Sequence, residues 1–355
     1  MKPWRIARFA QVINPVFDER LRREPGVELR VAPLAKTQAD VDAALEGADV
    51  YHVGPARNEM SALTFVTPAL LQRFPTLLCV STYGAGCDSV DVAACTRAGV
   101  LVVNQAGANK ISVAEHAMAL ILNVVHRIGE QDHRMRTEVL TSREALMGHE
   151  ILGLTLGLVG IGNIGIEVAR FARAFGMKVI ATDPFLEPVE IERRGAVPVS
   201  LDTLIETSDV VSLHCPRDAS TVGMFGAAQF ARMKPGAAFI STARGGIHDE
   251  HALAEALRSG HLSGAGLDVW EPEPPALDNP LLKLDNVVAS FHTAGVTHEA
   301  RRNIAVMGSE QIVQVLRGEK PPRLVNPEAW PAFRRRFEER RRLNDTAGFS
   351  HTAAR

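Results

Sequence analysis

The sequence has few cysteines, few aromatic residues and almost no net charge. Its four cysteines, Cys79, Cys87, Cys95 and Cys215, form neither a CxxC pair nor another metal-ligand spacing, which predicts reduced thiols and a cytoplasmic protein. A formal net charge of -2 excludes the broad basic surface that nucleic acid or an acidic membrane would need. No apolar run reaches the roughly 18 residues of a membrane span, and arginines interrupt the first apolar stretch, so no secretory signal is expected. Small molecules are therefore the expected partners.

What the sequence does contain is enough apolar material for two domains. The chain has 355 residues, of which 46% are hydrophobic, and a single core rarely keeps growing at this length. Short β-type runs alternate with helical stretches in two series. The expected strands cover residues 27–32, 50–54, 77–81 and 100–103 in the first series, and 154–159, 179–183, 210–214, 238–241, 264–269 and 287–290 in the second. This alternation predicts two α/β domains with doubly wound parallel sheets.

Two long helices and a charged tail complete the expected organisation. Residues 112–127 carry apolar side chains at helical spacing, and Ser112 with Glu115 three positions later predicts a capping box at the start of this helix. A second helix is expected over residues 299–317. The tail, residues 331–355, contains two blocks of three arginines and little apolar material. We therefore expect it to be a solvated or frayed helix outside the folded domains.

A glycine motif opens the second series. Gly160, Gly162 and Gly165, in the segment GIGNIG, follow a β-type run and precede a helical one. This context predicts a dinucleotide-binding turn: the first glycine permits the tight turn, the second lets the backbone approach a pyrophosphate, and the third lets helix and strand pack closely. The helix start, at Asn163 and Ile164, is expected to receive the negative charge. An ordinary glycine turn between strand and helix is the alternative.

An acidic residue stands at the expected end of the next strand. There Asp183 is placed to accept hydrogen bonds from both hydroxyls of an adenosine ribose. The same carboxylate would repel a 2'-phosphate, and the following residues 184–186, PFL, offer no arginine to bind one. The sequence therefore predicts NAD rather than NADP, with a surface acid at a strand end as the alternative.

Three polar residues follow other expected strands of the second series. Arg244 follows residues 238–241, Glu273 lies in a proline-containing loop after residues 264–269, and His292 follows residues 287–290. Redox chemistry at a 2-keto acid needs a proton donor beside the carbonyl oxygen, a cation for the carboxylate, and a group that keeps the donor charged. Histidine, arginine and glutamate fit these roles in that order. The carboxyl ends of parallel strands are also the edge where doubly wound sheets bind ligands.

Several ordered motifs resemble those of the D-isomer-specific 2-hydroxyacid dehydrogenase family, which includes phosphoglycerate dehydrogenases and glyoxylate or hydroxypyruvate reductases. The similarity runs over residues 77–326. It includes VAEH at 113–116, the glycine motif, VSLHCP at 211–216, STARGG at 241–246, GLDVWEPEP at 266–274 and HTAG at 292–295. Two positions depart from the family pattern: Phe291 replaces a usual proline, so the pocket wall is expected to differ, and a tryptophan usual upstream of residues 148–153 is missing.

The resemblance implies an NAD-dependent oxidoreductase that moves a hydride between nicotinamide and a small D-2-hydroxy acid or 2-keto acid. It implies a flavodoxin-like substrate domain over residues 1–107 and 297–330, and an inserted Rossmann domain for NAD over residues 108–296. It also implies a homodimer, because most members are homodimers built on the cofactor domain. In the catalytic set that it implies, His292 is the acid or base, Glu273 stabilises the imidazolium and Arg244 binds the substrate carboxylate.

The expected contacts with cofactor and substrate follow from the same motifs. The cofactor contacts are Gly160, Gly162, Asn163, Ile164, Gly165, Asp183, His214, Pro216, Thr242, Ala243, Asp268 and His292, with Asp268 holding the nicotinamide carboxamide. The substrate contacts are Arg244, Tyr83, Gly84, Ala85 and Gly86, with the N–H groups of Ala85 and Gly86 binding the carboxylate. Glyoxylate, hydroxypyruvate and 3-phosphoglycerate are candidate substrates.

Other residues leave alternatives open. Arg57 follows a strand of the first domain, and it either binds a phosphate or second carboxylate of the substrate or is a solvated loop arginine. The HDEH segment at 248–251 has the composition of a metal cluster, but an acidic first helical turn explains it, so no metal is expected. Glu115 and His116 lie on the linking helix and are expected to be a packing or interface pair rather than a catalytic one. An NAD-sensing protein of the same fold, without turnover, is the alternative function, and turnover of any keto acid would exclude it.

Overall fold

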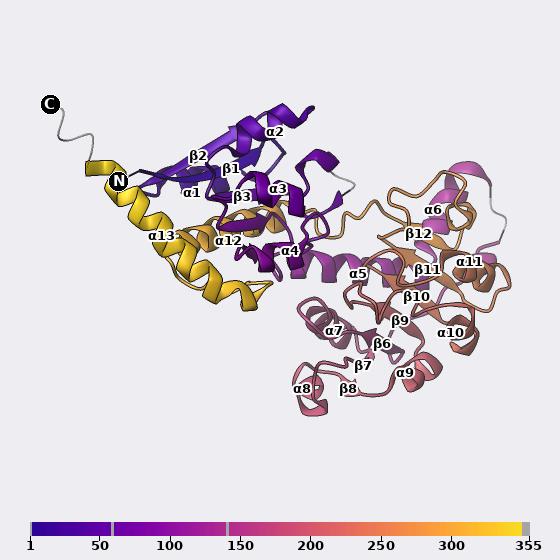
Figure 1. Ribbon diagram of the computed structural model, residues 1–355. Helices are drawn as coiled ribbons and strands as arrows, with labels where there is room; N and C mark the ends of the chain where they lie inside the picture. The colour runs from indigo at the N-terminus through magenta and orange to yellow at the C-terminus, as the bar shows by residue number, and fades with distance from the viewer. Residues whose placement is uncertain (1, 58–59, 140–141, 350–355) are drawn as a thin grey trace. The chain divides into compact units, whose positions relative to one another are not determined.

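The computed structural model describes residues 2–57, 60–139 and 142–349, and it divides into two compact units (Figure 1). Unit 1 comprises Met1–Asn109 and His298–Arg355, and unit 2 comprises Lys110–Thr297. The sequence placed the divisions at residues 107 and 297. The units divide at Asn109 and His298 because the helices α5 (Lys110–Val125) and α12 (His298–Leu316) begin there.

Unit 1 is built on a parallel sheet with the strand order β2-β1-β3-β4-β5, the flavodoxin-like order. Its strands are β1 (Trp4–Phe9), β2 (Val27–Ala32), β3 (Val50–Val53), β4 (Cys79–Thr82) and β5 (Leu101–Val103). Strand β1 is absent from the sequence-based expectation because Arg5 and Arg8 interrupt its apolar run. The structure satisfies both charges, since Arg5 lies 3.2 Å from Glu28 and Arg8 lies 2.6 Å from Asp18.

Helices cover both faces of this sheet. On one face lie α2 (Gln38–Leu45), α3 (Pro68–Arg73) and α4 (Val92–Arg97), which bury an apolar core with the strands. On the other face lie α1 (Val16–Arg23), α12 and α13 (Trp330–Phe349). Two short 3-10 helices, η2 (Ala62–Thr64) and η5 (Pro327–Ala329), belong to the connections.

Helix α13, in yellow in Figure 1, corrects the expectation of a solvated tail. Phe333 and Phe337 are 0% and 3% exposed, and the ring of Phe337 stacks on Trp4 with centroids 5.4 Å apart. The Nε of Arg340 lies 2.6 Å from the buried carboxylate of Asp49. The guanidinium of Arg336 donates to four carbonyl oxygens, those of Pro75, Leu77, Ala98 and Gly99. The arginines therefore hold the helix to unit 1, while residues 350–355 of the expected tail lie outside the described residues.

Unit 2 is built on a second parallel sheet, with the order β12-β11-β10-β9-β6-β7-β8. Its strands are β6 (Thr155–Val159), β7 (Lys178–Thr182), β8 (Val197–Pro198), β9 (Val210–Leu213), β10 (Ala238–Ser241), β11 (Gly264–Leu267) and β12 (Val287–Ala289). Starting from β6, the order runs outward in both directions, which is the Rossmann arrangement with one further strand. The order reverses between β6 and β9, and ligands of such sheets bind at that point.

Helices also cover both faces of the second sheet. One face carries α5, α7 (Gly165–Ala174) and α8 (Pro188–Arg193), and the other carries α9 (Leu201–Thr207), α10 (Ala227–Arg232) and α11 (Glu250–Arg258). Helix α6 (Ile128–Thr137) follows α5, and η3 (Glu144–Leu146) and η4 (Pro280–Lys283) are 3-10 helices. Within the described residues no single helix is long and apolar enough to cross a membrane; α5 and α6 pass that test only as a pair bent by 60°.

The start of α5 corrects the expected capping box. The helix begins at Lys110, so Ser112 lies inside its first turn and is buried. Its hydroxyl lies 2.8 Å from the hydroxyl of Thr297 instead of accepting a hydrogen bond from the backbone of Glu115. A serine followed three positions later by a glutamate also occurs by chance inside helices, so Ser112 and Glu115 do not by themselves identify a helix start.

Candidate active site

The glycine motif forms the loop between β6 and α7, and a different physical constraint explains why each of its three positions is glycine. Gly160 has a φ of 89°, which side chains disfavour. A Cβ on Gly165 would lie 2.5 Å from the carbonyl oxygen of Gly160, so helix and loop pack too closely for any side chain. A Cβ on Gly162, in contrast, would meet no protein atom within 4 Å. Helix α7 also lacks a side-chain cap, so open space and uncapped N–H groups occur together, as a pyrophosphate requires.

Asp183 follows β7 and lies against this loop. Its Oδ2 accepts the N–H of Ile161 at 3.1 Å, and its Oδ1 accepts the N–H of Phe185 at 3.1 Å. Each carboxylate oxygen retains a further lone pair for a ribose hydroxyl. Arg194, which the sequence analysis missed, donates to the carbonyl oxygen of Ile161 at 2.9 Å and to Glu190 at 2.9 Å. An arginine thus does reach this loop, from the end of α8 rather than from the residues after Asp183.

Polar atoms without protein partners lie at the carboxyl ends of β9 and β10. Burial lowers the pKa of His214 to about 4, so its ring is neutral near pH 7. Its Nε2 lies 2.9 Å from Ser212 Oγ, while its Nδ1 and the hydroxyl of Thr242 are buried without a partner in the described part of the chain. Buried polar atoms normally have partners, so these two atoms are available to hydrogen-bonding groups of a ligand. Together with the glycine loop, they fit a dinucleotide.

His292 and Glu273 form a direct pair beyond the ends of β12 and β11. The Nδ1 of His292 lies 3.0 Å from both carboxylate oxygens of Glu273, with the hydrogen bond directed at Oε2. His292 has a φ of 53°, a left-handed conformation that is uncommon for residues with a side chain. Because Nδ1 is engaged, Nε2 is the ring nitrogen that remains for a substrate. Phe291, the departure from the family pattern, is 82% exposed beside this ring.

The charges around His292 favour its protonated form. The hydrogen bond to Glu273 raises the pKa of His292 above its usual range, burial opposes this, and the charge of Glu273 adds to the increase. The charge of Arg244 lowers the same pKa, so Arg244 lies within electrostatic range of the ring. The contact between His292 and Glu273 is thus present in unit 2, while the place of Arg244 in the catalytic set stays a prediction.

Arg244 lies in a loop that is packed tightly after β10. Its Nη1 donates to the carbonyl oxygen of Ala243 at 2.7 Å. A Cβ on the next residue, Gly245, would lie 1.8 Å from the carbonyl oxygen of Trp270, so only glycine fits there. The loop that carries Arg244 is thereby pressed against the segment leading to Glu273, which fixes the position of the cation relative to the histidine pair.

Asp268 is fully buried beneath the His292 loop. Its carboxylate accepts the hydroxyl of Ser290 at 2.6 Å and the N–H groups of Thr293 and Ala294 at 2.8 and 3.0 Å. These bonds support the loop; the expected contact with a nicotinamide carboxamide stays a prediction. Sequence reasoning missed Ser290, although its place next to the strand end that carries His292 was a usable signal.

The expected substrate contacts of unit 1 lie at the carboxyl ends of β3 and β4. Tyr83 is buried, and a Cβ on Gly84 would lie 2.9 Å from Pro55, so this turn also requires glycine. In the part of the chain that the structure describes, the N–H groups of Ala85 and Gly86 donate to no protein acceptor. Arg57 is exposed; its Nε donates to the carbonyl oxygen of Asp88 at 2.7 Å, and its guanidinium lies 5.4 Å from the ring centre of Phe65.

The HDEH segment has the structural explanation that its sequence suggested. Asp249 is the N-cap of α11, and its side chain accepts the N–H of Ala252 at 3.0 Å. His248 is buried, and burial lowers its pKa to about 4. The acidic residue therefore serves the start of the helix.

Comparison with known proteins places the chain in a family. A family model described as the NAD binding domain of D-isomer specific 2-hydroxyacid dehydrogenase matches residues 118–294. D-3-phosphoglycerate dehydrogenase of Archaeoglobus fulgidus is 39% identical over 309 residues, which are 86% of this chain and 57% of that protein. Glyoxylate reductase of Korarchaeum cryptofilum is 40% identical over 257 residues, which are 72% of this chain and 77% of that protein. The chain thus spans little more than half of the phosphoglycerate dehydrogenase.

A solved structure agrees. D-lactate dehydrogenase of Aquifex aeolicus, crystallised with NAD and lactic acid, superimposes with a TM-score of 0.75 and 28% identity over 90% of this chain and 99% of that chain. The chain belongs to the D-isomer specific 2-hydroxyacid dehydrogenase family, and unit 2 is the NAD-binding domain of that family. The family and the fold class expected from the sequence are confirmed.

Proposed function

We propose that this protein is an NAD-dependent dehydrogenase that interconverts a small D-2-hydroxy acid and its 2-keto acid. The observation that carries the proposal is the His292–Glu273 pair, which is gathered with Arg244 at the ligand-binding edge of an NAD-binding domain. The relatives named as phosphoglycerate dehydrogenase, glyoxylate reductase and D-lactate dehydrogenase support the same reaction class.

The cofactor's part in the reaction is the hydride alone, which carries one hydrogen and two electrons. When bound, NADH gives a hydride to C2 of the keto acid and NAD accepts one from the hydroxy acid. The open space above Gly162 would hold its pyrophosphate and Asp183 its adenosine ribose. The orphaned atoms of His214 and Thr242 would bind polar groups of the same molecule.

His292 moves the proton that balances the hydride. In reduction, the C=O bond becomes a C–O single bond as hydride reaches C2, and Nε2 of His292 gives its proton to the oxygen. In oxidation, neutral His292 takes the hydroxyl proton instead. Glu273 holds Nδ1 in both directions, so the ring keeps its orientation while it changes charge.

Arg244 orients the substrate. Its guanidinium binds a carboxylate with two parallel hydrogen bonds, and this geometry holds the carboxylate of the 2-keto acid in the plane of the guanidinium group. Its charge also favours the negative charge that develops on the carbonyl oxygen during reduction.

Unit 1 contributes to substrate choice in this proposal. The N–H groups of Ala85 and Gly86, which have no protein acceptor in the described residues, are the contacts that unit 1 itself offers to a carboxylate. Arg57, held against Phe65 and the backbone of Asp88, favours a substrate with a phosphate or second carboxylate. Arg57→Ala should therefore weaken use of 3-phosphoglycerate by about tenfold or more, the loss of one charge-assisted hydrogen bond, and leave glyoxylate use unchanged.

The proposal is tested by measuring NADH oxidation with a panel of 2-keto acids, phosphorylated and not, for the wild type and His292→Ala. Loss of a general acid costs about 10²- to 10⁴-fold, while NADH affinity should stay within about twofold because the ring acts on the substrate. His251→Ala, an exposed histidine on α11, is the matched control. Parallel loss of NADH binding in His292→Ala would refute the assigned role.

The NAD-sensing alternative is not favoured, because the relatives carry enzyme names. A wild type that binds NADH but turns over no keto acid would support that alternative.

We also propose a homodimer formed through the segment after α5. All residues of α6 are at least partly exposed, and the segment shows the apolar side chains of Ile128, Met135, Val139, Met147 and Leu152, which are 50%, 84%, 94%, 70% and 69% exposed. Several exposed apolar side chains along one segment are typical of an interface.

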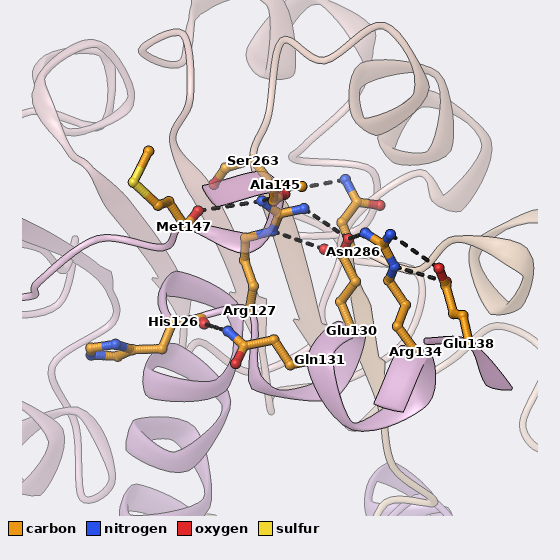
Figure 2. A network of polar contacts seen from close by, with 10 residues as sticks. All are labelled: His126, Arg127, Glu130, Gln131, Arg134, Glu138, Ala145, Met147, Ser263 and Asn286. Carbon is orange, nitrogen blue, oxygen red and sulfur yellow. Dashed lines mark hydrogen bonds and ion pairs between the residues drawn. The ribbon is translucent and has the colours of Figure 1, made fainter. Parts of the chain in front are cut away.

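Polar contacts, rather than burial, give this segment its shape. Figure 2 shows Arg127 paired with Glu130 and donating to the carbonyl oxygens of Ala145 and Met147, while Arg134 contacts Glu130 and Glu138. The mass in solution tests the proposal. Wild type should be a dimer and Met135→Asp with Met147→Asp a folded monomer; a monomeric wild type would contradict it.

We further propose a cytoplasmic location. The four cysteines are free thiols, which fits a reducing compartment. Cell fractionation checks this, and recovery of the protein outside the cytoplasm would contradict it.

A further inference from the structure

A chain of hydrogen bonds leads from helix α5 to the loop that carries the catalytic histidine. On α5, the Nε2 of His116 lies 2.9 Å from the hydroxyl oxygen of Ser290. Ser290 donates its hydroxyl to Oδ1 of Asp268 at 2.6 Å. His116 and Ser290 are 174 positions apart in the sequence, so only the fold brings them together.

The donors and acceptors in this chain have a single consistent arrangement. Both oxygens of Asp268 accept backbone N–H groups, which can only donate. The hydroxyl of Ser290 has one proton and gives it to Asp268, so Ser290 can only accept from the histidine. His116 must therefore carry a proton on Nε2, and its ring is a donor to Ser290.

Asp268 connects this chain to His292. The N–H of His292 donates to the backbone carbonyl of Asp268 at 2.8 Å. The side chain of Asp268 holds the two residues that follow, Thr293 and Ala294. These bonds hold His292 in its left-handed conformation, with a φ of 53°. The position of the Asp268 carboxylate thus affects the loop, and the Ser290 hydroxyl binds Oδ1, the same oxygen that accepts the N–H of Thr293.

We propose that His116 is a positioning residue for His292, which acts through Ser290 and Asp268 by fixing the carboxylate that holds the catalytic loop. A role in packing alone does not account for the geometry, because the His116 side chain is 28% exposed and its Nε2 lies 2.9 Å from the Ser290 hydroxyl and 3.7 Å from Oδ1 of Asp268. The kinetic consequence rests on the proposed function, whereas the hydrogen-bond chain itself does not.

Kinetics of three variants test the positioning role. His116→Ala should lower kcat for keto acid reduction by about tenfold, because small misplacements of a catalytic group are costly, and should leave KM and NADH affinity within about twofold. His116→Gln keeps an N–H donor and should recover most of the loss. His126→Ala, which removes an exposed histidine just after α5, is the matched control. Unchanged kcat in His116→Ala, or a His116→Gln enzyme no better than it, would overturn the proposal.

A double-mutant cycle and a deuterated cofactor distinguish positioning from a general loss of structure. If both residues act through one chain, adding Ser290→Ala to His116→Ala should cost little more than either change alone, and fully additive losses would contradict the chain. The isotope effect with deuterated NADH should increase in His116→Ala because the chemical step becomes slower. An unchanged isotope effect together with a lower kcat would place the defect elsewhere.

Nuclear magnetic resonance of the histidine rings separates this inference from the proposed function. The wild type should show His116 with its proton on Nε2, and His116→Ala should shift the ring signals of His292 while His126→Ala does not. A wild type without turnover would refute the proposed function, yet these signals would still test the chain. A His116 ring with Nε2 unprotonated, or His292 signals that stay unchanged in His116→Ala, would overturn it.

Discussion

The charge of Glu273 sets the pH range in which His292 acts as an acid, and Glu273→Gln tests this. Glutamine keeps the size and an oxygen that accepts from Nδ1, so the variant removes the negative charge 3.0 Å from the ring. The hydrogen bond to Glu273 is the largest cause of the raised pKa of His292. Without the charge of Glu273, burial and the charge of Arg244 lower that pKa, and the charge of Asp268 is the remaining cause that raises it.

The sign and size of the effect follow from the reaction. Reduction needs protonated His292, so reduction is fast below the pKa of His292 and becomes slower as the pH rises through that pKa. A charge-assisted hydrogen bond exceeds a neutral one by about 1.5 kcal/mol, which corresponds to about tenfold in rate. We therefore expect Glu273→Gln to lower kcat/KM for reduction about tenfold near neutral pH, and the loss should shrink at acidic pH. Oxidation needs neutral His292 and should extend to lower pH in the variant.

The assay is the pH profile of kcat/KM in both directions. Glu271→Gln is a matched control, since Glu271 lies in the same loop and pairs with Arg217 rather than with His292. The quantity to compare is the pH at which kcat/KM for reduction falls to half. If this pH is unchanged in Glu273→Gln, or shifts equally in both variants, Glu273 does not control the protonation of His292.

Three further predictions concern the cofactor site and unit 1. Gly162→Ala should leave the thermal stability of the cofactor-free protein unchanged, because a Cβ there meets open space, but should weaken NADH binding in a fluorescence titration; a large fall in Tm would contradict the role of Gly162. Asp183→Ala should weaken NADH binding about tenfold because hydrogen bonds to the ribose are lost. It should also reduce the preference for NADH over NADPH, since Arg194, which contacts the glycine loop, offers a positive charge to a 2'-phosphate. An unchanged preference for NADH would refute the ribose assignment. Arg340→Ala leaves the buried carboxylate of Asp49 without its ion-pair partner, so urea unfolding should show a free energy of unfolding that is lower by about 3 kcal/mol. A decrease below about 0.5 kcal/mol, as expected for a surface position, would show that α13 is not anchored there.

The sequence predicts most of the fold because parallel strands buried on both faces appear as short apolar runs. Two strands escape this signal. Strand β1 contains two arginines whose charges are neutralised by residues distant in the sequence, and β8 has only two residues, one of them a proline. The C-terminal helix was misjudged for a related reason: its arginines bind backbone carbonyls and a buried acid, contacts that composition does not reveal.

The candidate site was predictable to the extent that its residues follow strands. The glycine loop, Asp183, Arg244 and His292 follow strands closely, and Glu273 lies further along the loop after β11. The choice of His292 among the 12 histidines depends on the family resemblance, because periodicity does not single it out. Residues that act from other elements were not identified: Arg194 reaches the glycine loop from the end of α8, and His116 reaches Ser290 from α5. No periodicity connects such pairs, because their proximity is created by tertiary packing.

Transfer of a hydride to C2 with formation of a D-2-hydroxy acid is tested by analysis of the product formed with NADH that carries deuterium at both C4 positions. Wild type should convert a keto acid of the panel to the D-hydroxy acid with one deuterium bound to C2, and His292→Ala should not. Formation of the L-hydroxy acid, or of a D-hydroxy acid without deuterium at C2, would contradict it.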